Sequence, residues 1–240
     1  MVYVRPTVDG RPLSFGVSGK LWKDALIMYD RESFSLWSHV TGTAVKGKLT
    51  GTRLRLYPAL HTTWAEWKQL YPDSLVWDKR SDLGLEGTRN AYEGYFANPN
   101  QLGIFGTENP DRRLPGKEFV IGLTLDKVAV AYPYRHLSRQ PLVNDVVAGQ
   151  PVIVVFSADS ATGVVFSRNL ANRTLTFTSL RREGKELVME DVETKSTWRA
   201  LAGGAIRGRL AGTRLEQLPS TTGFWFAWKG FYPDTLVWKP

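Results

Sequence analysis

The sequence predicts a mainly β protein, made of antiparallel meanders or barrel-like sheets with short helices and arranged as two related repeat units. First, residues 28–77 return as residues 189–238 at a constant offset of 161, with 23 identities in 50 positions and no gap. Chance does not produce that match, so it indicates an internal duplication. Second, 9 Trp, 9 Tyr and 11 Phe favour strands and an aromatic core. Third, the apolar alternation comes in short runs separated by turn signals.

The first copy begins with a predicted hairpin. Residues 2–8 and 11–17 alternate as strands do, and Asp9-Gly10 between them is a strong two-residue turn signal. A meander of further strands is expected to follow at residues 26–30, 35–40, 44–49 and 52–57.

A short helix should close the first copy. Thr63 offers an N-cap and Glu66 follows three residues later, which is the spacing of a capping box. Trp64, Trp67 and Tyr71 share one helical face, and we expect that face to pack onto the sheet. Pro72 ends the helix, and residues 74–77 form a closing strand.

The domain prediction divides the chain at two points. Residues 1–78 form unit one, residues 79–117 an irregular connection rich in Gly, Asn and Pro, and residues 118–240 unit two with its own helix near residues 224–232. Residues 119–163 have no counterpart in the first copy, so unit one is expected to be incomplete at its N-terminus. The edge near residues 2–8 would then be unpaired, or covered by residues 78–116 or by a second chain, which predicts a homo-oligomer through a strand edge.

Composition narrows the functional classes. The net charge is +8, but the Lys and Arg are spread along the chain without a nucleic-acid-binding motif, so nucleic acid is not an expected partner. The chain has no Cys and three His, so we expect neither a metal site nor a cofactor. No apolar run approaches the ~20 residues of a membrane span, and Met1 is not followed by a signal peptide.

Several motifs together cover nearly the whole chain. The most specific is Met28-Tyr29-Asp30-Arg31 followed by Ser35-Leu36-Trp37-Ser38. The others are Val8-Asp9-Gly10-Arg11, Phe15-Gly16-Val17-Ser18-Gly19, Asp24, Thr41-Gly42, Gly47 with Leu49, Thr63-Trp64-Ala65-Glu66-Trp67, Ala131-Tyr132-Pro133 with Arg135, and Val143-Asn144-Asp145. In these motifs the chain resembles the bacterial and archaeal domain-of-unknown-function 3179 family.

The chain departs from that family's pattern at two places. Where the family usually has Cys-Pro-Leu-Cys-Gly-Thr, this chain has residues 157–162, Ser-Ala-Asp-Ser-Ala-Thr, without either thiol. Where the family has Trp-His-Glu, this chain has Arg139-Gln140-Pro141. The resemblance implies a β-rich domain, often extracytoplasmic, with a polar cluster of unknown use. It implies no established activity.

The duplication also helps to distinguish residues needed for folding from residues that are candidates for function. Residues kept in both copies are explained by folding, whereas polar residues lost from the second copy are better functional candidates. Four of five polar residues in one hairpin are lost, and only the first survives: Asp30, Arg31, Ser38, His39 and Thr41 become Asp191, Val192, Arg199, Ala200 and Ala202.

Two interpretations of this hairpin stay open. Arg31 could hold an anionic ligand, with Asp30 orienting it and His39 moving a proton. Alternatively, Asp30 and Arg31 form a turn network that merely fixes the hairpin.

Two functions therefore compete. The first is a non-catalytic binding or structural β module with an unknown small or anionic ligand. The second is part of an enzyme or redox-metal protein whose thiol segment lies upstream. Whether the protein is an enzyme is left open.

Overall fold

The computed structural model describes residues 1–76, 92–103, 105–107 and 111–240. Strands account for 44% of the residues and helices for 10%, which confirms the mainly β class. Among the described residues the strands form several open, mostly antiparallel sheets and no closed barrel, so the meander is the observed form.

Unit one contains a four-stranded meander of order β4-β5-β6-β7, with β1 paired to β8 and β2 to β3. Trp37 and Ile27 are buried in its core. Its elements are β1 (Val2–Tyr3), β2 (Thr7–Val8), β3 (Arg11–Pro12), β4 (Phe15–Trp22), β5 (Ala25–Asp30), β6 (Leu36–Ser38), β7 (Ala44–Lys46), β8 (Leu56–Tyr57) and α1 (Trp64–Leu70).

Unit two contains sheets of order β21-β9-β10-β22, β11-β12-β13-β20 and β16-β17-β18-β19, with β14 paired to β15. The buried apolar side chains of its strands form most of the core. Its elements are β9 (Phe119–Leu125), β10 (Val128–Pro133), α3 (Tyr134–Leu137), β11 (Leu142–Val147), β12 (Gln150–Ser157), β13 (Thr162–Ser167), β14 (Asn169–Leu170), β15 (Arg173–Thr174), β16 (Phe177–Glu183), β17 (Glu186–Asp191), β18 (Thr197–Arg199), β19 (Ala205–Arg207), β20 (Gln217–Leu218), β21 (Ser220–Phe224), α4 (Trp225–Phe231) and β22 (Leu236–Val237).

The two meanders have the same strand order. The bounds of β5, β6, β7, β8 and α1 recur 161 residues later as β17, β18, β19, β20 and α4. Both first strands also carry a register shift, between Val17 and Lys20 in β4 and between Thr178 and Arg181 in β16. A bulge at the same place in both sheets bends both hairpins in the same way.

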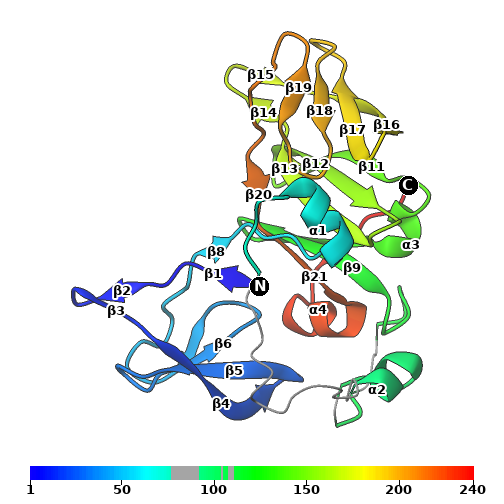
Figure 1. Ribbon diagram of the computed structural model, residues 1–240. Coiled ribbons are helices and arrows are strands. Elements are labelled where there is room, and N and C mark those ends of the chain that lie inside the picture. Colours follow the sequence, from blue (N-terminus) through cyan, green and yellow to red (C-terminus); the bar gives the residue numbers. More distant parts are fainter. Residues whose placement is uncertain (77–91, 104, 108–110) are drawn as a thin grey trace.

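The helices α1 and α4 each contact the other unit (Figure 1). Unit one supplies α1, but Leu60 and Leu70 pack against the core of unit two. Unit two supplies α4, but Lys23 of unit one donates from Nζ to the carbonyl of Gly230 at 2.6 Å. The C-terminal end of α1 therefore lies against the β16–β17 hairpin of unit two, and the C-terminal end of α4 lies against the β4–β5 hairpin of unit one. These two hairpins begin the two meanders, and each is called the first hairpin of its unit.

The aromatic face of α1 is a correction to the sequence analysis. We expected that face to pack onto the sheet, yet Trp64 is 50% exposed, whereas its counterpart Trp225 is fully buried. In unit two, Trp228 lies directly against Gly122 of β9. No strand equivalent to β9 occurs among the described residues of unit one, so Trp64 has no matching surface.

Three further expectations concern the ends of unit one. Leu75 and Val76 are not in a strand, and Trp77 lies outside the described residues, so the closing strand is not observed in unit one. The connection predicted to be irregular contains α2 (Glu93–Ala97). Among the described strands, β1 pairs with β8 alone, whereas β13, which holds the matching place in unit two, pairs with both β12 and β20.

Candidate functional site

Asp30 is the centre of a turn network. Its buried carboxylate accepts hydrogen bonds from Ser33 N at 2.5 Å, Ser33 Oγ at 2.9 Å and Trp37 Nε1 at 2.8 Å. Burial raises the pKa of Asp30, but the hydrogen bonds from Trp37 and Ser33 outweigh it and leave the pKa below its ordinary value.

The same network exists in unit two. Asp191 accepts from Thr194 N at 2.6 Å, Thr194 Oγ1 at 2.8 Å and Trp198 Nε1 at 2.9 Å. The aspartate thus has a structural role in both hairpins.

The other candidates do not join Asp30 in one site. Arg31 donates from Nη1 to Phe15 O at 2.6 Å, beside the end of β5. His39 contacts Leu26 O through Nδ1 at 2.9 Å, beside the start of β5. Leu26 and Asp30 are four residues apart, which is about 13 Å along a strand. Arg31 and His39 are therefore anchored at opposite ends of the strand.

Ser38 and Thr41 lie at the His39 end. Ser38 is buried and accepts the backbone N–H of Thr41 at 3.3 Å through its Oγ. Thr41 Oγ1 accepts the N–H of Thr43 at 3.4 Å. Both side chains therefore stabilise the turn into β7, and binding of a ligand at either end of the hairpin stays a prediction.

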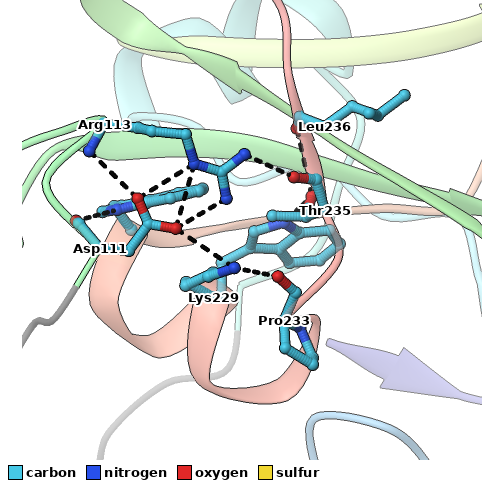
Figure 2. Close-up of polar contacts among 8 residues, drawn as sticks. Asp111, Arg113, Lys229, Pro233, Thr235 and Leu236 are labelled. Atoms are coloured by element: carbon cyan, nitrogen blue, oxygen red, sulfur yellow. Dashed lines mark hydrogen bonds and ion pairs between the residues drawn. The ribbon is translucent and has the colours of Figure 1, made fainter.

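A second polar cluster connects residues 111–113 to α4. Figure 2 shows Asp111 between Arg113, at 2.7 Å, and Lys229, at 3.2 Å. Arg113 also donates to Thr235 O at 2.9 Å, and its guanidinium lies over the Trp225 ring. Hydrogen bonding from Arg113 holds the pKa of Asp111 well below its usual range. These groups are occupied with one another, so we interpret the cluster as a structural clamp.

The junction between α1 and the first hairpin of unit two contains a cavity of about 300 Å³. Its apolar walls include Leu70 from α1 and Leu187 and Leu201 from unit two. Lys185 and Arg199 line its exposed side. Arg199 is paired with Glu186 at 2.9 Å.

Glu66 contributes a buried acid to this cavity. The residue is 7% exposed and lines the cavity from α1. Its backbone N–H donates to Thr63 Oγ1 at 3.2 Å, which is one half of the predicted capping box; the reciprocal bond from Thr63 N to the Glu66 carboxylate is not formed. None of the described residues forms a hydrogen bond or ion pair with its carboxylate. Among the described residues no buried side-chain oxygen lacks a hydrogen-bond partner, so the Glu66 carboxylate, although its residue is mostly buried, reaches the solvent of the cavity.

The matching junction of unit one is filled. Trp22 makes an edge-to-face contact with Phe231 of α4 at 5.4 Å, and the ammonium of Lys23 lies 5.6 Å from the same ring. The residues 161 positions later are Glu183 and Gly184. Glu183 instead pairs with Arg181 at 2.8 Å and Arg207 at 2.5 Å, and Gly184 has no side chain. The cavity wall includes Leu70, the counterpart of Phe231, which Trp22 contacts in the other junction.

Our sequence analysis missed Glu66 as a functional candidate, although the signal was available. We explained the residue by the capping box alone. Its counterpart in the second copy is Ala227, so the comparison of copies that selected the hairpin also selects Glu66. The other wall of the cavity comes from a distant segment, which the sequence pattern does not reveal.

The chain is thus a mainly β protein with a cavity between a helix and a distant hairpin. The family model described as "Protein of unknown function (DUF3179)" matches residues 1–237, so the chain belongs to this family. No curated protein and no solved structure matches the chain. None of the described helices has the length and apolar character needed to cross a membrane.

Proposed function

We propose that the chain is a non-catalytic binding module made of two β units related by duplication, and that the cavity between α1 and the β16–β18 part of the unit-two meander is its ligand site. The supporting observation is the contrast between the two equivalent junctions. One is closed by Trp22 and Lys23, while the other keeps a cavity beside the unpartnered Glu66. A carboxylate that faces a cavity and makes no hydrogen bond or ion pair with a described residue is free to contact a ligand.

The duplication is part of this proposal. Equal strand orders, equal aspartate networks and the constant offset of 161 residues support it. We propose further that unit one has no counterpart of residues 119–163 within this chain. The single pairing of β1 and the exposure of Trp64 support that view.

The test is to close the cavity with the residues of the other junction. The double substitution Glu183→Trp with Gly184→Lys copies Trp22 and Lys23 into unit two. Gly184 has φ +61° and Lys23 has φ +51°, so a lysine suits this backbone. In a thermal-shift screen of small polar metabolites, compounds that stabilise the parent should fail to stabilise the filled variant. A parent that no compound stabilises, or a filled variant that responds equally, would contradict the proposal.

A second candidate function is anion binding at Arg31 alone. One observation favours it: the guanidinium is exposed and its hydrogen bond to Phe15 leaves other N–H groups for an anion. His39 is not part of this reduced site. Stabilisation by inorganic phosphate should be lost in Arg31→Val, which copies Val192, and retained in His39→Ala.

The alternative of an enzyme or redox-metal protein depends on thiols that this chain does not contain. It stays a prediction about polypeptide upstream of residue 1.

A further inference from the structure

The chemistry of the cavity identifies a class of ligand. Its lining includes two mostly buried residues, the acid Glu66 and Leu201, while a second acid, Glu186, is paired with Arg199. Its exposed end has two cations, Lys185 and Arg199. Two partly buried leucines, Leu70 and Leu187, add apolar side chains to the lining.

The filled junction shows what kind of group suits the mostly buried part of the lining. There, an aliphatic chain ending in an ammonium, that of Lys23, donates to the carbonyl of Gly230 on the helix. In the open junction the counterpart of Lys23 is Gly184, which supplies no ammonium, and Gln69 replaces Gly230. Glu66 adds a negative charge where unit two has Ala227. A primary ammonium on an alkyl chain would therefore supply the missing charge partner.

The exposed end calls for the opposite charge. Arg199 is shared with Glu186, but Lys185 makes no ion pair with any described residue. An anionic group on the ligand would meet both cations there, where solvent weakens each contact but long-range attraction remains.

We propose that the cavity binds an ω-aminocarboxylate: a small zwitterion with a primary ammonium, an alkyl chain and a terminal carboxylate. The ammonium lies against Glu66, the chain against the leucines, and the carboxylate beside Lys185 and Arg199. This inference rests on the proposed function, because it names the ligand of the same cavity. The volume of about 300 Å³ is at the lower end of ligand sites, as a short unbranched ligand requires.

The test is a calorimetric titration with 6-aminohexanoate as the probe. Hexylammonium lacks the carboxylate and hexanoate lacks the ammonium. We expect one saturable site for 6-aminohexanoate and at least about tenfold weaker binding of either analogue, since each loses one charged contact worth about 1.4 kcal/mol or more.

Two variants address the two ends. Glu66→Gln should weaken 6-aminohexanoate binding at least about tenfold. It should stay folded, because the Thr63 cap uses the backbone and because Ala227 holds this place in unit two. Lys185→Gln, on the surface, should weaken 6-aminohexanoate but leave hexylammonium unchanged. Glu93→Gln on α2 is the matched control, because it removes one exposed carboxylate outside the cavity.

Three results would overturn the inference: no saturable binding by the parent up to about 10 mM, equal binding by Glu66→Gln, or binding of hexanoate as tight as that of 6-aminohexanoate. If compounds of another class bind the parent and are lost in the filled variant, the ligand class is wrong but the proposed function stands. If no compound stabilises the parent, both fail.

Discussion

At the scale of the residue, the aspartate of each meander hairpin is a structural anchor. Asp30 and Asp191 each receive an indole N–H and a turn N–H in a buried position. The copy comparison already separated this residue from the others, because it is the only one of the five candidates that both copies keep.

Replacement of either aspartate by alanine should destabilise the protein to a similar degree. Asp30→Ala leaves the Trp37 indole and the Ser33 N–H without their acceptor, and we expect a loss of roughly 1–3 kcal/mol. Asp191→Ala should show a comparable loss. Urea unfolding monitored by tryptophan fluorescence measures both, and a loss within about 0.5 kcal/mol of zero would show that the network is not an anchor.

The depressed pKa of Asp30 also predicts a pH dependence. A carboxyl whose pKa is lower in the folded state contributes stability above its unfolded value, near 3.8, and that stability is lost as the pH falls through the folded value. The free energy of unfolding of the parent should therefore fall more steeply below about pH 4 than that of Asp30→Asn. Parallel curves would contradict this assignment.

At the scale of the element, one glycine in each meander allows the chain to turn closely past the preceding hairpin. Gly47 has φ +110° and Gly208 has φ +91°, and a Cβ on either would lie 2.7 Å from the Cα of Ser35 or Ser196. Backbone atoms cannot move aside as the end of a flexible side chain can, so neither position has room for a Cβ.

Gly47→Ala and Gly208→Ala should each cost roughly 1–3 kcal/mol through strain and overlap. The control is Gly94→Ala in α2, where a Cβ meets nothing within 4 Å and where the better helix propensity of alanine should leave stability unchanged or higher. Thermal unfolding of the three variants measures these changes in stability. If Gly47→Ala and Gly208→Ala unfold at the same temperature as Gly94→Ala, the contact between glycine and serine backbone does not constrain the hairpin.

Local chemistry explains which elements were predictable. Asp9 and Gly10 have φ +50° and +76°, the conformation that a two-residue hairpin needs, and the hairpin was predicted from those two letters. The strand expected over residues 52–57 shortens to β8 because Thr52 N bonds to Leu49 O in a turn and Leu54 N bonds to Gly42 O beside an isolated bridge between Thr43 and Arg53. Alternating residues alone do not reveal such competing bonds.

At the scale of the whole molecule, the packing of α1 against unit two was not predictable. The apolar face of α1 has the same spacing whether it meets its own sheet or the hairpin of unit two. Only the pairing of distant groups, such as Thr62 with Thr162 at 2.7 Å, shows which surface it meets. The cavity depends on that packing, so the comparison of the two copies could have selected Glu66 but not its surroundings.

The filled variant tests the packing independently of any ligand. Glu183→Trp with Gly184→Lys should raise the free energy of unfolding by about 1 kcal/mol, because Trp burial against α1 outweighs the loss of exposed ion pairs. The matched control, Trp22→Glu with Lys23→Gly, should open the α4 junction and lower stability. If the filled variant is less stable than the parent, the junctions are not equivalent.

The central claim is that the cavity beside Glu66 is a ligand site. The most direct measurement is a crystal structure of the protein grown with 6-aminohexanoate. The account predicts the ammonium within hydrogen-bond distance, about 2.7–3.2 Å, of a Glu66 oxygen, with no ligand at the closed junction of Trp22 and Lys23. An unliganded cavity in which Lys185 pairs with Glu66, or a ligand bound elsewhere, would contradict it.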